Sequence, residues 1–256
     1  MNILKLVFAS GALVLAACGA PATPEPTQTS TPRPTPTETP VPPSATPEPS
    51  PTPEPTPTPD PLLFRDDFEG QLGEGWQWVR EDDRYWSLTS SPGWLEIMAR
   101  SGNVNDGNIK NLLLRPAPQG DFELETTLRF RPTGNFQIAG LLIYQSADQH
   151  VQFGRAFCNA PQCTGDGFYL DLITDGNFSP ENFATDAPET DTVQLRLRRE
   201  GETYTGYISV DGVQWILIGV HRSDMVPIFV GLVAGQAVGS TPKPAQFDYF
   251  LINALP

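Results

Sequence analysis

The sequence has few of the residues that nucleophilic, metal or nucleic-acid chemistry needs. Its 256 residues include only two His and three Cys, and 16 basic residues stand against 30 acidic ones. His150 and His221 lie in neither a Gly-x-Ser-x-Gly elbow nor a His-x-His pattern, so neither indicates a hydrolase triad or a zinc site. Residues 62–256 carry a net charge of −11, which would repel phosphate backbones. We therefore expect no nucleic-acid partner.

The sequence also lacks an apolar run long enough to span a bilayer comfortably. Its longest such run, Leu6–Ala17, follows Lys5 and has the length of a signal-peptide core. It leads into Leu15-Ala16-Ala17-Cys18-Gly19, which resembles a bacterial lipobox, a signal whose Cys is lipidated and becomes the mature N-terminus. The resemblance implies a lipoprotein signal peptide over residues 1–18, with an ordinary secretory peptide as the alternative. We expect an extracytoplasmic location in the cell envelope, with membrane contact through a lipid anchor on Cys18.

Residues 19–61 consist largely of Pro and Thr. The stretch from Pro21 to Pro61 holds 17 of the 28 prolines and 11 threonines. Because proline removes a backbone donor and fixes φ, we expect a disordered chain with polyproline II character. We interpret these residues as a stalk that holds the next domain away from the membrane. A tether of uncritical length would have the same composition.

Residues 62–256 show no sustained helical periodicity, only short alternating runs between Gly, Asn, Asp and Pro. In Asp121–Arg131 apolar and polar side chains alternate, as they do around Val193–Arg198. Asp211-Gly212 favours a two-residue hairpin turn between Thr203–Val210 and Val213–Gly219. Further strands are expected at Leu63–Phe68, Trp86–Thr89, Trp94–Ala99, Gln137–Gln145, Val151–Phe157, Gly167–Ile173, Ile228–Gly235 and Gln246–Asn253. The sequence predicts an all-β domain, a jelly-roll β-sandwich of two antiparallel sheets.

Several short motifs occur along this domain in a fixed order. They are Phe64–Phe68 (FRDDF), Gly75–Trp78 (GWQW), Trp86–Thr89 (WSLT), Pro92–Leu95 (PGWL), Ala139–Tyr144 (AGLLIY), Leu195–Arg198 (LRLR), Ser209–Trp215 (SVDGVQW), Val230–Leu232 (VGL) and Phe247–Phe250 (FDYF). Together they resemble the C-terminal concanavalin A-like domain of family 43 β-xylosidases and related stand-alone domains. The resemblance implies a jelly roll with adjacent terminal strands and a glycan-associated accessory role. In those xylosidases a five-bladed propeller carries the chemistry, and no sequence for one occurs here, so we expect no enzymatic activity.

Two small sites are expected within the domain. Cys158 and Cys163 enclose a turn at Pro161 and predict a disulfide in an oxidising compartment. Asp67 and Asp248, with Asp66, should meet where the first and last strands lie side by side, and carboxylates there suit a structural Ca²⁺ ion. In the alternative interpretation Asp67 only caps a turn.

A sugar ring presents an apolar face to aromatic side chains and hydroxyls to polar ones. The five tryptophans are expected mainly to fill space between the sheets: Trp76, Trp78, Trp86, Trp94 and Trp215. The candidates for a ligand groove lie on strands suited to a concave sheet: Tyr144, Gln152, Arg155, Phe157, Tyr169 and Asp171.

Three functions remain open at this point. The first is a surface-anchored, non-catalytic lipoprotein that binds a polysaccharide or oligosaccharide. The second is a structural or protein-interaction module without sugar binding. The third is a cryptic glycoside hydrolase, for which Glu123 and Glu125 lie two residues apart on one strand face. Those carboxylates would otherwise form a solvated face with Arg129 and Arg131 as partners.

Overall fold

The computed structural model describes residues 61–161, 163–181, 183–235 and 241–256. The predicted signal peptide, Cys18 and the predicted stalk up to residue 60 lie outside these ranges. Within the part of the chain that is described, no helix is long and apolar enough to cross a membrane.

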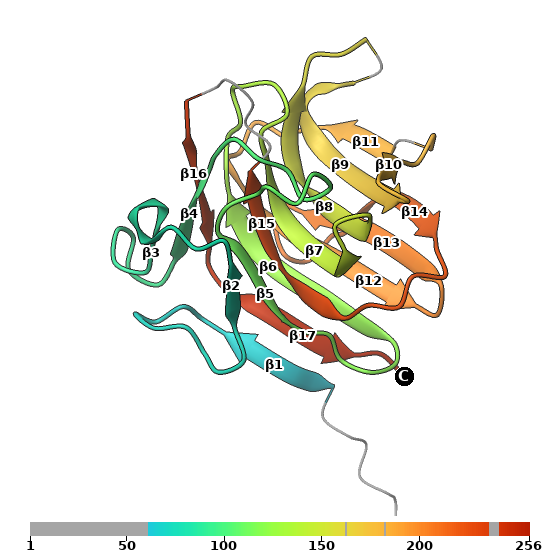
Figure 1. Ribbon diagram of the computed structural model, residues 1–256, viewed down its shortest axis with the longest axis horizontal. Helices are drawn as coiled ribbons and strands as arrows, with labels where there is room; N and C mark the ends of the chain where they lie inside the picture. The colour runs from blue at the N-terminus through green and yellow to red at the C-terminus, as the bar shows by residue number, and fades with distance from the viewer. Residues whose placement is uncertain (1–60, 162, 182, 236–240) are drawn as a thin grey trace, which may run out of the picture. The chain divides into compact units, whose positions relative to one another are not determined.

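Two antiparallel sheets make up the domain, as the alternating sequence predicts (Figure 1). The nine-stranded sheet has the order β14-β13-β12-β6-β16-β4-β3, with β17 pairing with both β6 and β1. Its strands are β1 (Leu62–Asp66), β3 (Trp86–Ser87), β4 (Leu95–Ala99), β6 (Phe122–Arg129), β12 (Thr192–Glu200), β13 (Thr203–Ser209), β14 (Ile216–Arg222), β16 (Lys243–Phe247) and β17 (Phe250–Ala254).

The eight-stranded sheet has the order β10-β9-β8-β7-β15-β5-β2, with β11 also pairing with β9. Its strands are β2 (Gln77–Val79), β5 (Leu112–Pro116), β7 (Ile138–Ser146), β8 (Gln149–Cys158), β9 (Gly165–Thr174), β10 (Asn177–Phe178), β11 (Phe183–Asp186) and β15 (Phe229–Gly235). A single 3₁₀ turn, Asp83–Tyr85, is the only helical element within the described ranges.

The core lies between the two sheets and follows from strand alternation. On β6, Phe122, Leu124 and Leu128 are fully buried, and on β8 Val151 and Phe153 face them from the other sheet within one cluster. Burying each such side chain stabilises the fold by roughly 1.5–3 kcal/mol relative to leaving it exposed. The opposite face carries the remaining side chains, and on the eight-stranded sheet part of that face is also buried in smaller apolar clusters.

The first and last strands are adjacent, as the family resemblance implies. β1 pairs antiparallel with β17, with Arg65 opposite Leu251. The predicted single strand Gln246–Asn253 is instead two strands, β16 and β17, because the backbone at Asp248 turns aside and its N–H donates to the Thr127 carbonyl at 3.0 Å. β16 pairs with β4, while β17 pairs with β1.

The predicted two-residue turn at Asp211-Gly212 is wrong. β13 ends at Ser209 and β14 begins at Ile216, so the loop is longer. One oxygen of Asp211 accepts hydrogen bonds from the backbone N–H groups of Val213 and Gln214. This local capping stabilises a wider loop in place of the tight turn.

Candidate ligand-binding pocket

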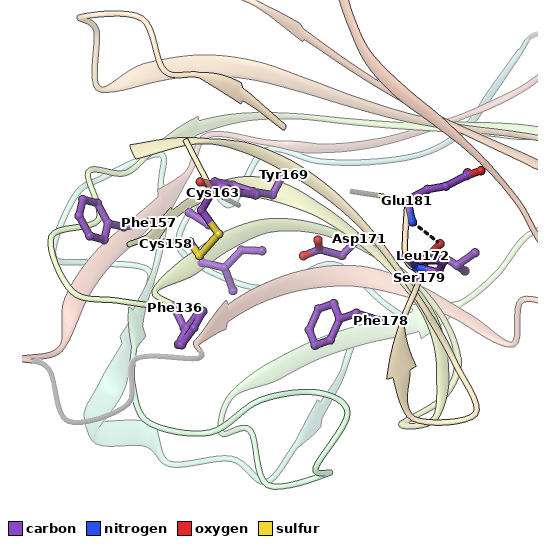
Figure 2. A pocket seen from close by; sticks show the side chains of 13 residues that line it. Phe136, Phe157, Cys158, Cys163, Tyr169, Asp171, Leu172, Phe178, Ser179 and Glu181 are labelled. Atoms are coloured by element: carbon purple, nitrogen blue, oxygen red, sulfur yellow. Dashed lines mark hydrogen bonds between the residues drawn. A yellow bond between two sulfur atoms is a disulfide. The ribbon is translucent and has the colours of Figure 1, made fainter. Parts of the chain in front are cut away.

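A pocket of about 490 Å³ opens on the face of the eight-stranded sheet that is turned away from the core (Figure 2). Its lining comes from the loop before β7, from β7, β8, β9 and β10, from the loop between β8 and β9, and from the segment after β10. The lining residues are Phe136, Ile138, Ala156, Phe157, Cys158, Cys163, Tyr169, Asp171, Leu172, Phe178, Ser179, Pro180 and Glu181. The lining is mainly apolar, with a small number of polar groups, as is typical of small-molecule sites.

Tyr169 forms one wall of the pocket and is held rigidly. Its hydroxyl donates to the Gly165 carbonyl at 2.9 Å and accepts from the Thr164 N–H at 3.1 Å. It packs with Ile138 and Ala156 in an apolar cluster separate from the main core. The ring therefore presents a fixed apolar surface, while the hydroxyl is used within the chain.

Cys158 and Cys163 form a disulfide beside this wall, with Cα atoms 5.6 Å apart. The Cys163 N–H also donates to the Ala160 carbonyl at 2.9 Å, so the loop closes tightly. The cross-link restricts the loop at one end of the pocket.

Two phenylalanine rings at the pocket are unusually open to solvent. Phe136 is 47% exposed and Phe178 is 52% exposed. The Phe136 N–H donates to the Phe157 carbonyl at 2.7 Å, which holds this residue at the pocket despite its positive φ of 62°. In Figure 2 both rings lie on one side of the pocket, with Tyr169 and the disulfide on the other. Exposed aromatic rings at a concavity favour contact with a ligand.

Asp171 supplies the central polar group. One of its oxygens accepts a hydrogen bond from Gln152 Nε2 at 3.0 Å, and Gln152 lies opposite it on β8. Burial raises the pKa of Asp171 to about 6, although the Gln152 hydrogen bond acts in the opposite direction. Among the described residues no basic side chain forms an ion pair with it.

We predict that Asp171→Asn stabilises the domain at neutral pH. The native pKa of about 6 exceeds the ordinary value of 3.8, so the wild-type free energy of unfolding should fall as pH rises from about 4 to 6. After allowing for contact with solvent at the pocket, the penalty above pH 6 is about 2 kcal/mol. The variant should be more stable by that amount at pH 7.5 and equal to wild type at pH 4, measured by urea unfolding. Equal stability at both pH values would contradict this prediction.

The structure brings three of the six predicted ligand residues to the pocket: Phe157, Tyr169 and Asp171. Gln152 lies behind Asp171 as its hydrogen-bond donor. Arg155 does not reach the pocket, because it is 1% exposed on the core side of β8 and bound to Asp166. Phe136 and Phe178 were missed by the sequence analysis.

Tyr144 lies outside the pocket as well. It packs with Phe229 against a second apolar cluster, in which Val104 and Ile109 of the loop after β4 cover Leu142 of β7. The loop therefore closes this part of the sheet's outer face. The pocket at β8–β10 lies on a part of the face that this loop does not cover.

The predicted metal ligands have other partners. The Asp66 carboxylate accepts hydrogen bonds from the N–H groups of Phe68, Gly73 and the Trp76 indole at 2.7–2.9 Å. Asp67 forms an exposed ion pair with Arg65 at 2.6 Å. Burial, followed by the nearby Asp67 charge, raises the pKa of Asp248. Residues 61–256, where described, contain no group of three or more His, Cys, Asp or Glu side chains that could hold a metal ion. Calcium binding thus stays a prediction without geometric support.

Glu123 and Glu125 lie on the outer face of the nine-stranded sheet. Each pairs with an arginine that is distant in the sequence but adjacent in the sheet. Their partners are Arg198 and Arg196 of β12, at 2.8 Å in each case, and not the expected Arg129 and Arg131. The other Glu125 oxygen accepts from the Tyr249 hydroxyl at 2.5 Å. Both Glu125 oxygens are therefore engaged within the chain.

The tryptophans divide into two groups. Trp76, Trp78 and Trp86 pack against the main core, as expected. Trp94 and Trp215 instead lie against the guanidinium groups of arginines on the outer face of the nine-stranded sheet, with ring-centroid distances of 4.2 and 3.7 Å.

Comparison with known proteins adds a family match. Residues 65–253 match the model of the family described as the β-xylosidase C-terminal concanavalin A-like domain. A curated xylan 1,3-β-xylosidase from a Vibrio species is 26% identical over 192 residues, which are 66% of this chain and 33% of the relative. The chain thus spans about a third of the length of the curated relative it matches.

Solved structures share the fold. A GH43 protein from Bacillus licheniformis superposes with a TM-score of 0.68 at 21% identity, covering 75% of this chain and 39% of that one. A xylan β-1,4-xylosidase from Bacillus halodurans gives 0.64 at 25% identity, covering 74% and 38%. A β-1,3-glucanase from Mycobacterium marinum gives 0.52 at 14% identity, covering 75% and 98%.

Proposed function

Because this chain belongs to the family of β-xylosidase C-terminal concanavalin A-like domains, we propose that it is a non-catalytic, glycan-binding lipoprotein of the cell envelope. Domains of this type are typically non-catalytic. The observation that carries the proposal is the pocket of about 490 Å³, with solvent-exposed rings and a central carboxylate. Its volume falls within the range of roughly 300–1,000 Å³ common for small-ligand sites and suits one or two sugar units.

One further observation bears on the ligand, and another supports binding without hydrolysis. The curated relative and one of the matching solved structures are named for xylan, which makes a xylan-type ligand the first to test. Glu123 and Glu125 are also held by arginine pairs, whereas a glycosidase needs carboxyl groups free to reach the scissile bond. The ligand in this proposal is a polysaccharide or oligosaccharide such as xylan.

The membrane anchor is proposed from the sequence. Cys18 lies in the lipobox-like motif, and the Pro-rich residues that follow would place the domain at a distance from the lipid surface. We predict that Cys18→Ala moves the full chain from the membrane fraction to the soluble fraction, measured by fractionation of cells that express it. An unchanged distribution would contradict lipid anchoring.

The glycan proposal is tested by calorimetric titration of the full chain with xylo-, cello- and chito-oligosaccharides. We predict binding of at least one of them and a loss of about tenfold or more in Phe178→Ala, because an aromatic contact contributes about 0.5–1.5 kcal/mol beyond its buried area.

Val213→Ala is the matched control, since Val213 is 80% exposed in the β13–β14 loop of the other sheet. Its affinity should equal that of wild type. If no oligosaccharide binds at millimolar concentration, the sandwich is instead a structural or protein-interaction module. Release of reducing sugar that Glu125→Gln abolishes would indicate a hydrolase.

A further inference from the structure

The pocket contains charge of one sign only. Of its lining residues, Asp171 and Glu181 are ionisable acids, and none is Lys or Arg. Arg155, on a neighbouring strand position, directs its guanidinium to the core side, where it bonds Asp166 and the Thr190 carbonyl at 2.8 Å. An anionic sugar would therefore meet repulsion in the pocket without a compensating cation.

The side chains of Asp171 and Glu181 point in different directions. Figure 2 shows the Asp171 carboxylate directed into the space between the disulfide and Phe178, and the Glu181 side chain extending away from it. Asp171 accepts one hydrogen bond from the neutral Gln152 amide and lacks a cationic partner among the described residues. A half-buried carboxylate without a counter-charge is costly, so a ligand cation beside it would be favoured.

The rings around Asp171 suit the same kind of ligand. Phe136 and Phe178 lie exposed at the pocket, and the Tyr169 hydroxyl is already bonded to the Gly165 carbonyl. Phe136 and Phe178 therefore offer a ligand exposed aromatic surface, beside the largely buried ring of Tyr169. Aromatic faces attract both the C–H face of a sugar and a positively charged nitrogen.

We propose that the pocket selects a sugar unit carrying a protonated amino group, as in a partly deacetylated glucosamine polymer, with its ammonium group at Asp171 and its apolar face against Phe136 or Phe178. The inference rests on the proposed glycan binding and specifies the ligand class of that same site. Uronic acids and sulfated sugars are disfavoured by the same charge arrangement.

The test compares tetrasaccharides of equal length with and without ammonium charge. The full chain is titrated at about pH 6.5, slightly above the pKa of Asp171 and low enough to keep sugar amines largely protonated. The probes are the β-1,4-linked glucosamine tetramer, its N-acetylated counterpart and xylotetraose. We expect the glucosamine tetramer to bind at least tenfold more tightly than the acetylated one, and this ratio to shrink at high salt.

Two variants assign the preference to Asp171. Asp171→Asn keeps the shape of the side chain and should reduce the ratio to near one, with thermal unfolding confirming that the variant is folded. Glu200→Gln removes an exposed carboxylate on β12 of the other sheet and should leave the ratio within twofold of wild type.

The outcomes separate the two proposals. Equal binding of the charged and acetylated tetramers by wild type, or an unchanged ratio in Asp171→Asn, overturns the amino-sugar inference and leaves glycan binding in place. Absence of binding to every tetramer overturns the proposed function, and the inference falls with it.

Discussion

Asn in place of Asp166 should destabilise the domain by about 3 kcal/mol. The Arg155 guanidinium, 1% exposed, donates from Nε and Nη2 to the two Asp166 oxygens at 2.8 Å each. The Asn amide keeps one acceptor oxygen but turns an NH2 group toward an Arg155 N–H, so the buried cation loses its counter-charge and one of its acceptors and keeps the Thr190 carbonyl. The loss of stability is large because the Asp166 charge compensates for the desolvation of the buried Arg155 guanidinium, and the variant lacks that compensation.

Urea unfolding of the full chain measures this effect. The control is Asp191→Asn, which breaks the exposed pair between Asp191 and Arg131, whose side chains are 50% and 55% exposed. Exposed pairs contribute about 0–1 kcal/mol, so this variant should stay close to wild type. If Asp166→Asn loses no more stability than Asp191→Asn, the buried ion pair does not have the role assigned to it.

Ala in place of Gly154 should lower the free energy of unfolding of the domain by about 3 kcal/mol or more. A Cβ atom at this position would lie 2.0 Å from the Ala139 carbonyl oxygen and 2.9 Å from the Gly140 Cα on the adjacent strand. Both contacts are with backbone, which cannot move without separating β7 from β8. The second of these strands, β8, also contributes Ala156 to the lining of the pocket.

Thermal unfolding and the yield of folded protein measure the effect of this change. The control is Ala156→Gly, on the same strand and the same face. This change increases the backbone freedom of the unfolded chain without a steric clash, so it should lower the free energy of unfolding by about 1 kcal/mol or less. A Gly154→Ala protein as stable as wild type would show that the two strands can separate at this point without loss.

The fold could be predicted because it depends on a repeated local signal. Alternation in Asp121–Arg131 places Phe122, Leu124 and Leu128 on one buried face, as the structure shows. The short strands β2, β10 and β11 gave no such signal, since two to four residues cannot establish a period. The apolar run at β5 has side chains buried on both faces and does not alternate.

The site was harder to predict because it depends on which face each residue occupies. Arg155 alternates in phase with Val151 and Phe153, so it shares their core side, and its charge is met there by Asp166. Tyr169 and Asp171 alternate with the core residues Phe168 and Leu170 and therefore face outward. No sequence pattern could bring Phe136 and Phe178 to the same pocket, because loop geometry positions the first and a two-residue strand the second.

Nuclear magnetic resonance mapping of bound oligosaccharide on the isotope-labelled full chain tests the central claim most directly. If glycans bind in the pocket at β8–β10, saturating ligand should shift the signals of the pocket residues Phe136, Tyr169, Asp171 and Phe178. The signals of Trp215, on the opposite sheet, should stay unchanged. Shifts centred on Trp94 and Trp215, with the pocket signals unmoved, would contradict the account.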